Sequence, residues 1–272
     1  MVTTGTPLEL CRSEALCFSR VPSAEAAPLA ALEKIIQGDD VAVFIFEPLV
    51  LGSGGMIMYS PEVLDKMVAM CQAHGVLCLA DEVMTGFGRT GKFFASNYLE
   101  NQPDIFAFSK GLTGGTLPMS ITSCSEKVFN AFLSDDKNKT FYHGHSYTGN
   151  PVGCAAALAS VDLLVKEETW DNIHRIIAKH TAFRQKITHH PATLEVRQQG
   201  TILAVEIKTG ASSSYFNNIR DKINAIFMRE KVLLRPLGNV VYVLPPYCIT
   251  NEQLDRVYEV IELTLDWVQA QA

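Results

Sequence analysis

Residues 76–82, VLCLADE, form an unbroken run of apolar residues that ends in two acidic side chains, and this run decides the fold class. A strand buried on both faces of a sheet has this pattern, whereas a strand with one wet face alternates apolar and polar residues. Two further runs have the same form, VAVFIFEP at 41–48 and IFAFSK at 105–110. SITSCS at 120–125 is a candidate fourth strand. The sequence therefore predicts a sheet of strands that are buried on both faces.

Helical patterns separate these predicted strands. SAEAAPLAALEKII at 23–36 is expected to form a helix that stops at Gly38. A second helix is expected to begin after Ser60 as its cap, with Pro61 at its first position, and to stop at Gly75. Alternation of strand and helix means parallel pairing through right-handed crossovers. The first part of the chain is therefore predicted to be an α/β layered domain.

The second part of the chain has shorter connections and predicts a smaller α+β domain. We expect two long helices, two strands on either side of Gly200, a further helix, a strand pair and a last helix with a capping box from Thr250 to Gln253. In order, these elements cover residues 150–167, 168–187, 193–208, 217–231, 233–236 with 240–246, and 250–267. The predicted domains are therefore residues 1–160 and residues 161–272.

Composition excludes several classes of protein. The 272 residues are 47% hydrophobic and 19% charged, and the net charge of −6 comes without any basic block, so a nucleic-acid partner is not expected. The longest apolar stretch is broken by Glu47 and Pro48 and is shorter than the ~20 residues that span a bilayer. The first ten residues do not resemble a secretory signal, and seven cysteines without a CxxC pair indicate reduced thiols. We expect a cytoplasmic protein without a membrane partner.

Ionisable residues follow three of the predicted strands. Glu47 ends the first run, Asp81 and Glu82 end the second, and Lys110 ends the third. Any one of them could simply mark the point where a strand meets solvent. Ligands of parallel sheets bind beyond the carboxyl ends of the strands, and glycine-rich turns next to these residues would let backbone approach a ligand closely. The turns are GSGG at 52–55, TGFGRTG at 85–91 and KGLTGG at 110–115.

The segment GFGRTG at 86–91 fits the GxGxxG pattern of dinucleotide-binding proteins. That pattern should lie at the end of a strand and open a helix, and the next strand should end in an acid. Here five residues separate the glycines from the strand, no long helix pattern follows, and the next strand ends in Lys110. A nicotinamide-dependent oxidoreductase is therefore an alternative that ranks behind the following interpretation.

A lysine and an acid at the ends of neighbouring strands suit pyridoxal phosphate. A primary amine such as that of Lys110 forms a reversible Schiff base with this cofactor, and a carboxylate such as that of Asp81 keeps the ring nitrogen protonated. The protonated ring withdraws electrons from the α-carbon of a substrate. The two residues therefore predict a site for pyridoxal 5′-phosphate.

Three stretches carry a family resemblance: LADEVMTGFGRTGKFFA at 79–95, PDIFAFSKGLTGGTLPMS at 103–120 and HGHSYTGNPVGCAAALAS at 143–160. Together they resemble the class III (fold type I) pyridoxal-phosphate aminotransferases, and the resemblance covers nearly the whole chain. It implies a cofactor-binding large domain with a mainly parallel sheet over residues 1–160, and a small C-terminal domain over residues 161–272. It also implies transamination of small-molecule substrates in two stages by a homodimer with shared active sites.

The resemblance assigns roles to individual residues. Lys110 would carry the cofactor and move the proton during catalysis, and Asp81 would pair with the pyridine nitrogen. His145 and Ser146 match the positions that bind the cofactor phosphate of the partner subunit, where the family more often has Pro-Thr. Gly144 matches a backbone position that contacts substrate.

Two further residues match the family outside these stretches. Arg235 in LLRPLGN matches the arginine that holds the substrate carboxylate, and a guanidinium suits this because it binds a carboxylate with two hydrogen bonds. Glu47 in FEPLVLGSGGM matches a family acid near the site. Without the family match, Arg235 would be a partner in a surface salt bridge. His143 and His145 lack a third ligand nearby, so no metal is expected.

Relative to the family, the material before VAVFIFEP is expected to be short. Family members have there part of the large-domain sheet, a glycine/serine loop for the cofactor phosphate, and aromatic residues that stack on the ring. We therefore expect the large domain to be N-terminally incomplete. The alternatives that follow are another class III omega-aminotransferase and a catalytically incomplete fragment.

Overall fold

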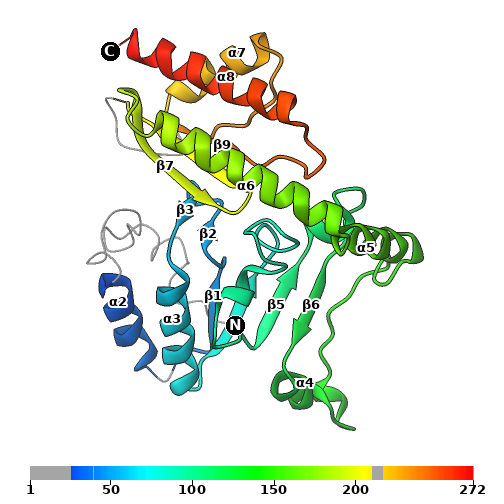
Figure 1. The fold of residues 1–272 in the computed structure, drawn as a ribbon. Helices are drawn as coiled ribbons and strands as arrows, with labels where there is room; N and C mark the ends of the chain where they lie inside the picture. Colours follow the sequence, from blue (N-terminus) through cyan, green and yellow to red (C-terminus); the bar gives the residue numbers. More distant parts are fainter. Residues whose placement is uncertain (1–25, 39, 210–216, 272) are drawn as a thin grey trace. The chain divides into compact units, whose positions relative to one another are not determined.

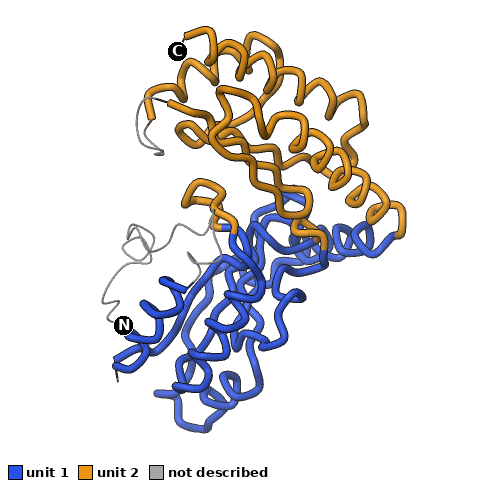
Figure 2. The backbone as a smooth tube through the Cα atoms, turned by 60° about the vertical axis from the view of Figure 1, so that its left-hand side comes forward, with its two compact units in different colours: residues 1–50, 59–87, 92–166 blue, residues 51–58, 88–91, 167–272 orange. Residues whose placement is uncertain are grey.

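The computed structural model describes residues 26–38, 40–209 and 217–271 (Figure 1). The first residues of the helix expected at 23–36, together with Cys11 and Cys17, lie outside this part of the chain. The chain divides into two compact units (Figure 2). The first comprises residues 1–50, 59–87 and 92–166, and the second comprises residues 51–58, 88–91 and 167–272. The predicted domain boundary after residue 160 stays a prediction.

The first unit is built on a four-stranded sheet in the order β1-β4-β5-β6 (Figure 1). β1, β4 and β5 are parallel, and β6 is antiparallel to β5. The three predicted runs and the candidate fourth strand therefore all form strands, and the sheet is mainly parallel. The strands are Val43–Phe46, Leu77–Asp81, Ile105–Phe108 and Ile121–Cys124.

The prediction that 41–48 is buried on both faces is wrong for the described part of the chain. Val43 and Ile45 are 43% and 47% exposed, whereas Phe46 is buried. The register pairs Phe46 with Ala80, so these two lie on the face of the sheet that also carries Cys78. The Sγ of Cys78 lies 3.8 Å from the carbonyl oxygen of Val68, which shows that this face packs against a helix. The opposite face has no comparable cover among the described residues.

Helix signals place the helices of the first unit. α3 begins after Ser60, whose hydroxyl accepts a hydrogen bond from Val63 N at 3.3 Å, and Pro61 is its first residue, as predicted. Gly75, just beyond this helix, has a φ of 75°, a left-handed conformation that favours glycine. The α-helices of the unit are α2 (Ala26–Ile36), α3 (Pro61–Ala73), α4 (Glu126–Phe132) and α5 (Pro151–Leu164). Short 3-10 helices are η3 (Ala95–Tyr98), η4 (Lys110–Thr113) and η5 (Lys137–Lys139).

The second unit packs three helices against a three-stranded antiparallel sheet in the order β7-β8-β9 (Figure 1). Its core joins apolar residues of all three helices to β8 and β9, and includes Phe183, Leu203, Phe227 and Ile261. The strands are β7 (Thr193–Gln199), β8 (Ile202–Ile207) and β9 (Val240–Val243), and the helices are α6 (Glu167–Ile187), α7 (Ile219–Arg229) and α8 (Asn251–Gln269). The two-stranded sheet of β2 (Val50–Leu51) and β3 (Ile57–Met58) lies where the chain passes between the units.

One predicted strand of the second unit is wrong. LLRP at 233–236 forms no strand, and only Leu237 makes an isolated bridge, to Val240. Pro236 has no backbone N–H, so it cannot donate to a ladder at its own position. The two long helices predicted around residue 167 are separate, since α5 ends at Leu164 and α6 begins at Glu167.

None of the helices in the described ranges is both long enough and apolar enough to cross a membrane.

Candidate functional site

Two of the predicted site residues lie at the same edge of the sheet in the first unit. β4 and β5 are parallel neighbours, and Asp81, the last residue of β4, is opposite Ala107. Lys110 follows β5 after Ser109 and is the first residue of η4. Because parallel strands present their carboxyl ends at one edge, the fold brings an acid and a lysine to the edge where ligands of such sheets bind.

The carboxylate of Asp81 is oriented by the backbone that follows it. Its Oδ1 accepts a hydrogen bond from Val83 N at 3.0 Å, and the side chain is half-buried. The next backbone amide, that of Glu82, donates to Ala107 O at 2.9 Å and ties the end of β4 to β5. The position of this acid is therefore fixed by two hydrogen bonds to its own loop and to the neighbouring strand.

Lys110 has an unusual backbone conformation for a residue with a side chain. Its φ of 45° lies in the left-handed region, which costs a non-glycine residue free energy and is found mainly where function or packing demands it. The turn is held from both sides, because Gly115 N donates to Lys110 O at 3.2 Å and Ser160 Oγ donates to Gly111 O at 3.0 Å. The lysine side chain itself is exposed. An exposed primary amine is thus presented by a constrained turn.

Phe87 packs directly against this turn. A Cβ added to Gly111 would lie 2.9 Å from the Cβ of Phe87, so only glycine allows this approach. The ring of Phe87 meets those of Phe94 and Phe108 edge-on, at centroid distances of 5.6 and 6.0 Å. Phe87 was not predicted from the sequence, although its place between two glycines of TGFGRTG is a signal of close packing.

Glu82 is a second residue whose role was not predicted from the sequence. Its side chain is fully buried and accepts hydrogen bonds from Thr85 Oγ1 at 2.9 Å, Ala95 N at 3.0 Å and Ser96 N at 2.7 Å. These three donors belong to the loop that leaves β4 and to its return at η3. The carboxylate therefore joins both ends of that loop.

The tip of the same loop, residues 88–91, belongs to the second unit. Arg89 Nη1 donates to Pro245 O at 2.5 Å, and the guanidinium lies 4.6 Å from the centre of the Tyr247 ring. Burial raises the pKa of Tyr247 to about 12, against the opposite influence of Arg89. Gly200, with a φ of 57°, lies so close to this tip that an added Cβ would be 2.3 Å from the carbonyl carbon of Thr90. The GxGxxG segment therefore forms a turn whose tip is hydrogen-bonded within the second unit, and no helix begins at this segment.

The predicted phosphate-binding residues lie in an exposed segment of the first unit. Gly144, His145 and Ser146 are all exposed. A local turn orders them, because His145 N donates to Thr148 Oγ1 at 3.0 Å and Tyr147 N donates to His145 Nδ1 at 3.1 Å.

The other two predicted positions lie in different units. Arg235 is exposed in the second unit, in the extended segment before Leu237. Glu47 follows β1 in the first unit and is half-buried, and its carbonyl oxygen accepts a hydrogen bond from the hydroxyl of Tyr59. The first unit therefore carries Asp81, Lys110, Glu47 and the segment 144–146, and the second unit carries Arg235.

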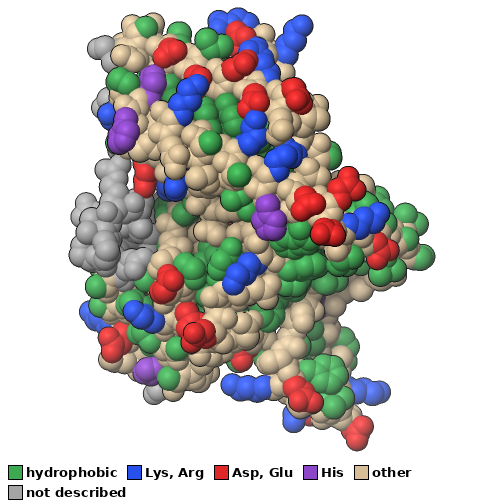
Figure 3. Space-filling view, viewed as in Figure 1, with side chains coloured by type: hydrophobic (Ala, Val, Ile, Leu, Met, Phe, Trp, Pro, Cys, Tyr) green, Lys and Arg blue, Asp and Glu red, His purple; other side chains and the backbone are tan. Residues whose placement is uncertain are grey.

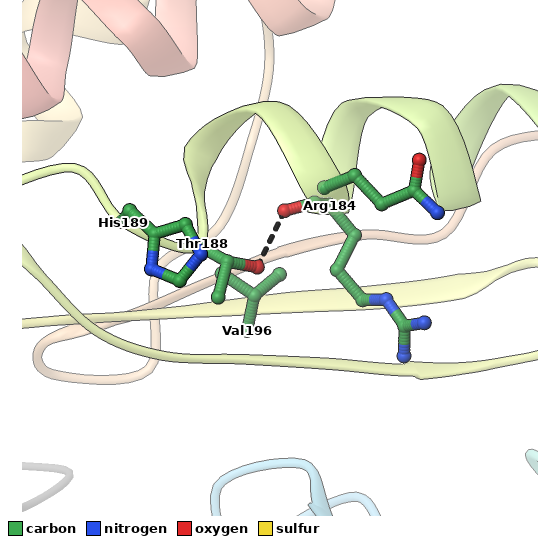
Figure 4. Close-up of a pocket in the computed structure, with 5 residues that line it drawn as sticks. Arg184, Thr188, His189 and Val196 are labelled. Atoms are coloured by element: carbon green, nitrogen blue, oxygen red, sulfur yellow. Dashed lines mark hydrogen bonds between the residues drawn. The ribbon is translucent and has the colours of Figure 1, made fainter.

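The second unit has a shallow hollow of about 410 Å³ (Figure 4). Thr188 Oγ1 donates to Arg184 O at 2.6 Å at its rim. The hollow is lined by Arg184, Gln185, Thr188, His189 and Val196, none of which is a predicted site residue. Within the described ranges, no three His, Cys, Asp or Glu side chains gather in a way that could hold a metal ion.

The sequence profile of the family described as Aminotransferase class-III matches residues 13–265. The chain belongs to this family. The resemblance drawn from its three motifs is therefore confirmed, and the nicotinamide alternative is not favoured.

Two curated relatives of the chain share one name. The adenosylmethionine-8-amino-7-oxononanoate aminotransferase of Synechococcus elongatus is 44% identical over 246 residues, which cover 90% of this chain and 57% of that protein. The enzyme of the same name from Geobacter sulfurreducens is 37% identical and is matched over 88% of this chain and 54% of its own length. This class III aminotransferase chain thus spans about half the length of the curated relatives it matches.

Solved structures of transaminases share the fold. An (S)-enantioselective omega-transaminase from Thermomicrobium roseum matches with a TM-score of 0.82 at 30% identity, over 90% of this chain and 56% of that one. The ornithine aminotransferase of Toxoplasma gondii matches with a TM-score of 0.77 at 27% identity, over 90% and 56%. The predicted fold class, fold type I with a mainly parallel sheet, is confirmed.

Class III aminotransferases use pyridoxal 5′-phosphate, and the residues at the edge of the sheet fit this cofactor. Lys110 offers an exposed primary amine on a constrained turn, and Asp81 offers an oriented carboxylate at the end of the adjacent strand. An amine and a carboxylate are the two groups that the aldehyde and the ring nitrogen of this cofactor require. The donor set therefore matches the cofactor of the family.

Proposed function

We propose that this protein transfers an amino group from S-adenosylmethionine to 8-amino-7-oxononanoate, giving 7,8-diaminononanoate for biotin biosynthesis. Curated relatives that bear the name of this activity are up to 44% identical to the chain, which supports the proposal. Three runs of this sequence resemble that type within the family, GLTGGTLPMS at 111–120, HGHSYTGNP at 143–151 and LLRPLGNVVYVLPPY at 233–247. The observation that carries the proposal is the placement of Asp81 and Lys110 at the carboxyl ends of adjacent parallel strands.

In this proposal the cofactor, when bound, supplies an electron sink for the carbon that loses or gains the amino group. Lys110 Nζ would hold the cofactor between turnovers and would move a proton at the substrate carbon. Asp81 holds a proton on the ring nitrogen, because an ionised carboxylate stabilises a nearby cation. The hydrogen bond from Val83 N keeps that carboxylate aimed in one direction.

Residues 144–146 and Arg235 would bind the non-reacting parts of the ligands. His145 and Ser146 would contact the cofactor phosphate of a partner subunit, and Gly144 would contact substrate through its backbone. Arg235 would bind a substrate carboxylate with two hydrogen bonds. The exposure of all four residues accords with groups that meet a ligand or a partner.

A homodimer is part of the proposal. The first unit exposes many large apolar side chains along α4, α5 and the segment between them, and Figure 3 shows apolar side chains gathered over α5 and around α4. Large exposed apolar patches mark sites of interaction with proteins, membranes or ligands, and here we propose a second copy of the chain as the partner. Its members include Phe129, Phe132, Leu133, Phe141, Tyr142, Tyr147, Val152, Leu158, Leu163 and Val165. We also propose a cytoplasmic location, which the usage of cysteine favours.

The first experiment tests the cofactor site. Protein mixed with pyridoxal 5′-phosphate is reduced with borohydride, digested and analysed by mass spectrometry. We expect the pyridoxyl group on Lys110, and its loss in Lys110→Ala. Lys222→Ala, which removes an exposed lysine of α7, is the matched control and should leave the labelling of Lys110 unchanged. Labelling spread evenly over surface lysines would contradict the assignment.

The second experiment tests the substrates. A panel of amino donors is supplied with 8-amino-7-oxononanoate, and 7,8-diaminononanoate is measured. We expect product with S-adenosylmethionine. Product from other amines only would assign the chain to another class III omega-aminotransferase.

A third measurement addresses the length of the chain, which spans 57% of the Synechococcus elongatus relative. Turnover of this chain is compared with turnover after fusion to the part of that relative which it does not match. Activity of the unfused chain would refute the alternative of a catalytically incomplete fragment, and activity of the fusion alone would support it.

A further inference from the structure

A buried carboxylate follows Asp81 of the proposed cofactor site in the chain. It belongs to Glu82, which is fully buried. All three of its hydrogen-bond donors are neutral: the hydroxyl of Thr85 and the backbone amides of Ala95 and Ser96. Among the described residues no ion pair joins it to a lysine, arginine or histidine. Burying a carboxylate costs free energy unless the group is hydrogen-bonded. These three hydrogen bonds offset that cost and fix the position of the side chain.

The three hydrogen bonds fix both ends of one loop. Thr85 lies at the start of the loop that leaves β4, and Ala95 and Ser96 open η3, where the loop returns. The backbone of Glu82 adds two more bonds, since its amide donates to Ala107 O at 2.9 Å and its carbonyl accepts from Gly86 N at 3.0 Å. Glu82 thereby attaches the loop to the end of β4 and to β5.

The same loop supports the turn that carries Lys110. Phe87 lies one residue after Gly86, and its Cβ and ring are so close to Gly111 that no side chain fits there. Phe94, just before the return of the loop, packs on Phe108 with ring centroids 4.7 Å apart. Displacement of the loop would therefore remove the support beneath Gly111 and let the left-handed turn at Lys110 relax.

We propose that Glu82 is a positioning residue for Lys110, acting through the loop and the contact between Phe87 and Gly111. This inference rests on the proposed function, in which Lys110 carries the cofactor. Glu82 touches neither cofactor nor substrate in this proposal. Its carboxylate fixes the loop, the loop fixes Phe87, and Phe87 fixes the turn.

The test compares Glu82→Gln with Phe87→Leu and with the control Glu62→Gln, an exposed glutamate of α3. Gln keeps the size of Glu but turns an NH₂ group toward one of the backbone N–H donors. Amide hydrogen exchange is measured at two places in the protein without added cofactor, the loop and the turn. The amides of Ala95 and Ser96 report the loop, and those of Leu112 and Gly115, which donate to Ser109 O at 3.1 Å and Lys110 O at 3.2 Å, report the turn.

We expect Glu82→Gln to exchange about tenfold faster at both places, as the loss of one or two hydrogen bonds implies. Phe87→Leu should exchange faster at the turn only, and Glu62→Gln should match the wild type. A Glu82→Gln variant that loses protection at Ala95 and Ser96 but keeps it at Leu112 and Gly115 would overturn the inference, because Glu82 would then hold the loop alone. If Glu82→Gln does not fold, Thr85→Val, which removes one donor, must show the same pattern in weaker form.

A second measurement uses the protein loaded with pyridoxal 5′-phosphate. The visible absorbance of the bound cofactor is titrated with pH in the wild type and in each variant. We expect a shifted midpoint in Glu82→Gln and Phe87→Leu, and an unchanged midpoint in both variants would count against the inference. Wild-type protein that binds no cofactor would refute the proposed function instead, and the exchange experiment would still decide the role of Glu82.

Discussion

His180 is a titratable side chain buried completely inside the second unit. Its Nε2 lies 3.1 Å from Thr201 O, which can only accept, so Nε2 carries the hydrogen and Nδ1 accepts from the hydroxyl of Tyr258 at 2.6 Å. Burial lowers the pKa of His180 from 6.5 to about 4, against a smaller opposite influence of the hydrogen bond to Thr201. The folded protein therefore keeps this ring neutral.

This shift predicts a loss of stability in acid. As the pH falls below the ordinary pKa of 6.5, His180 binds a proton in the unfolded chain. In the folded protein His180 stays neutral until the pH nears its lowered pKa of about 4. The free energy of unfolding should therefore drop by about 3 kcal/mol across this window. Urea unfolding followed by the fluorescence of Trp170 and Trp267, both in the second unit, measures it.

The matched variants are His180→Gln, which removes the titration, and His189→Gln, which removes an exposed histidine. The first should flatten the pH dependence relative to the wild type and the second should not. Equal slopes in all three proteins would contradict the assigned pKa.

Among single residues, the sequence identified the ionisable ends of the strands but not what supports them. Asp81 and Lys110 could be singled out because each follows an apolar run. Glu82 could not be separated from Asp81 by pattern, since its burial depends on donors 13 and 14 residues further along the chain. Close packing of Phe87 on Gly111 likewise depends on contacts between two loops.

At the level of elements, helix ends were the most predictable feature because their signals are local. The capping box of α8 forms as predicted: Thr250 Oγ1 accepts from Gln253 N at 3.2 Å and Gln253 Oε1 accepts from Thr250 N at 3.0 Å. Burial of a strand depends instead on what covers it. Val43 and Ile45 are apolar, and the prediction of two buried faces failed because residues far along the chain decide that cover.

Thr250→Ala should lower the free energy of unfolding by about 1 kcal/mol, because it removes one half of the capping box. Asn218→Ala is the control within the same unit. Asn218 is the N-cap of α7 but makes no capping hydrogen bond through its side chain, so its loss should cost much less. Urea unfolding followed by tryptophan fluorescence compares the two variants, and equal losses would show that the capping bonds of Thr250 do not stabilise α8.

For the whole molecule, the sequence predicted two parts but not how the chain passes between them. Residues 51–58 and 88–91 both lie in the N-terminal half, and both belong to the second unit. Arg197 on β7 holds the first segment, donating to Met56 O at 3.0 Å and Gly55 O at 3.1 Å, and Thr201 N holds the second by donating to Arg89 O at 2.9 Å. The two segments belong to the second unit because of contacts between residues that are distant in the sequence. Local sequence patterns do not reveal such contacts.

The exposed apolar surface of the first unit leads to a prediction about assembly. Leu158 on α5 is 68% exposed, and the same helix also exposes Val152 and Leu163. A surface of this kind in water is unfavourable unless a partner covers it. If a second copy covers it, a charge at Leu158 must be buried without a partner in the dimer, which costs several kcal/mol.

Leu158→Glu should therefore convert a dimer into a monomer of 29.9 kDa, as measured by sedimentation velocity. It should also weaken cofactor retention, because His145 and Ser146 would no longer reach the site of a partner. Leu263→Glu is the control, since Leu263 is 47% exposed on α8 of the second unit and should leave the mass unchanged. A monomeric wild type, or a Leu158→Glu variant that stays dimeric, would contradict the proposed interface. Loss of the dimer with unchanged cofactor retention would preserve the interface but refute the shared site, because each subunit would then hold its phosphate alone.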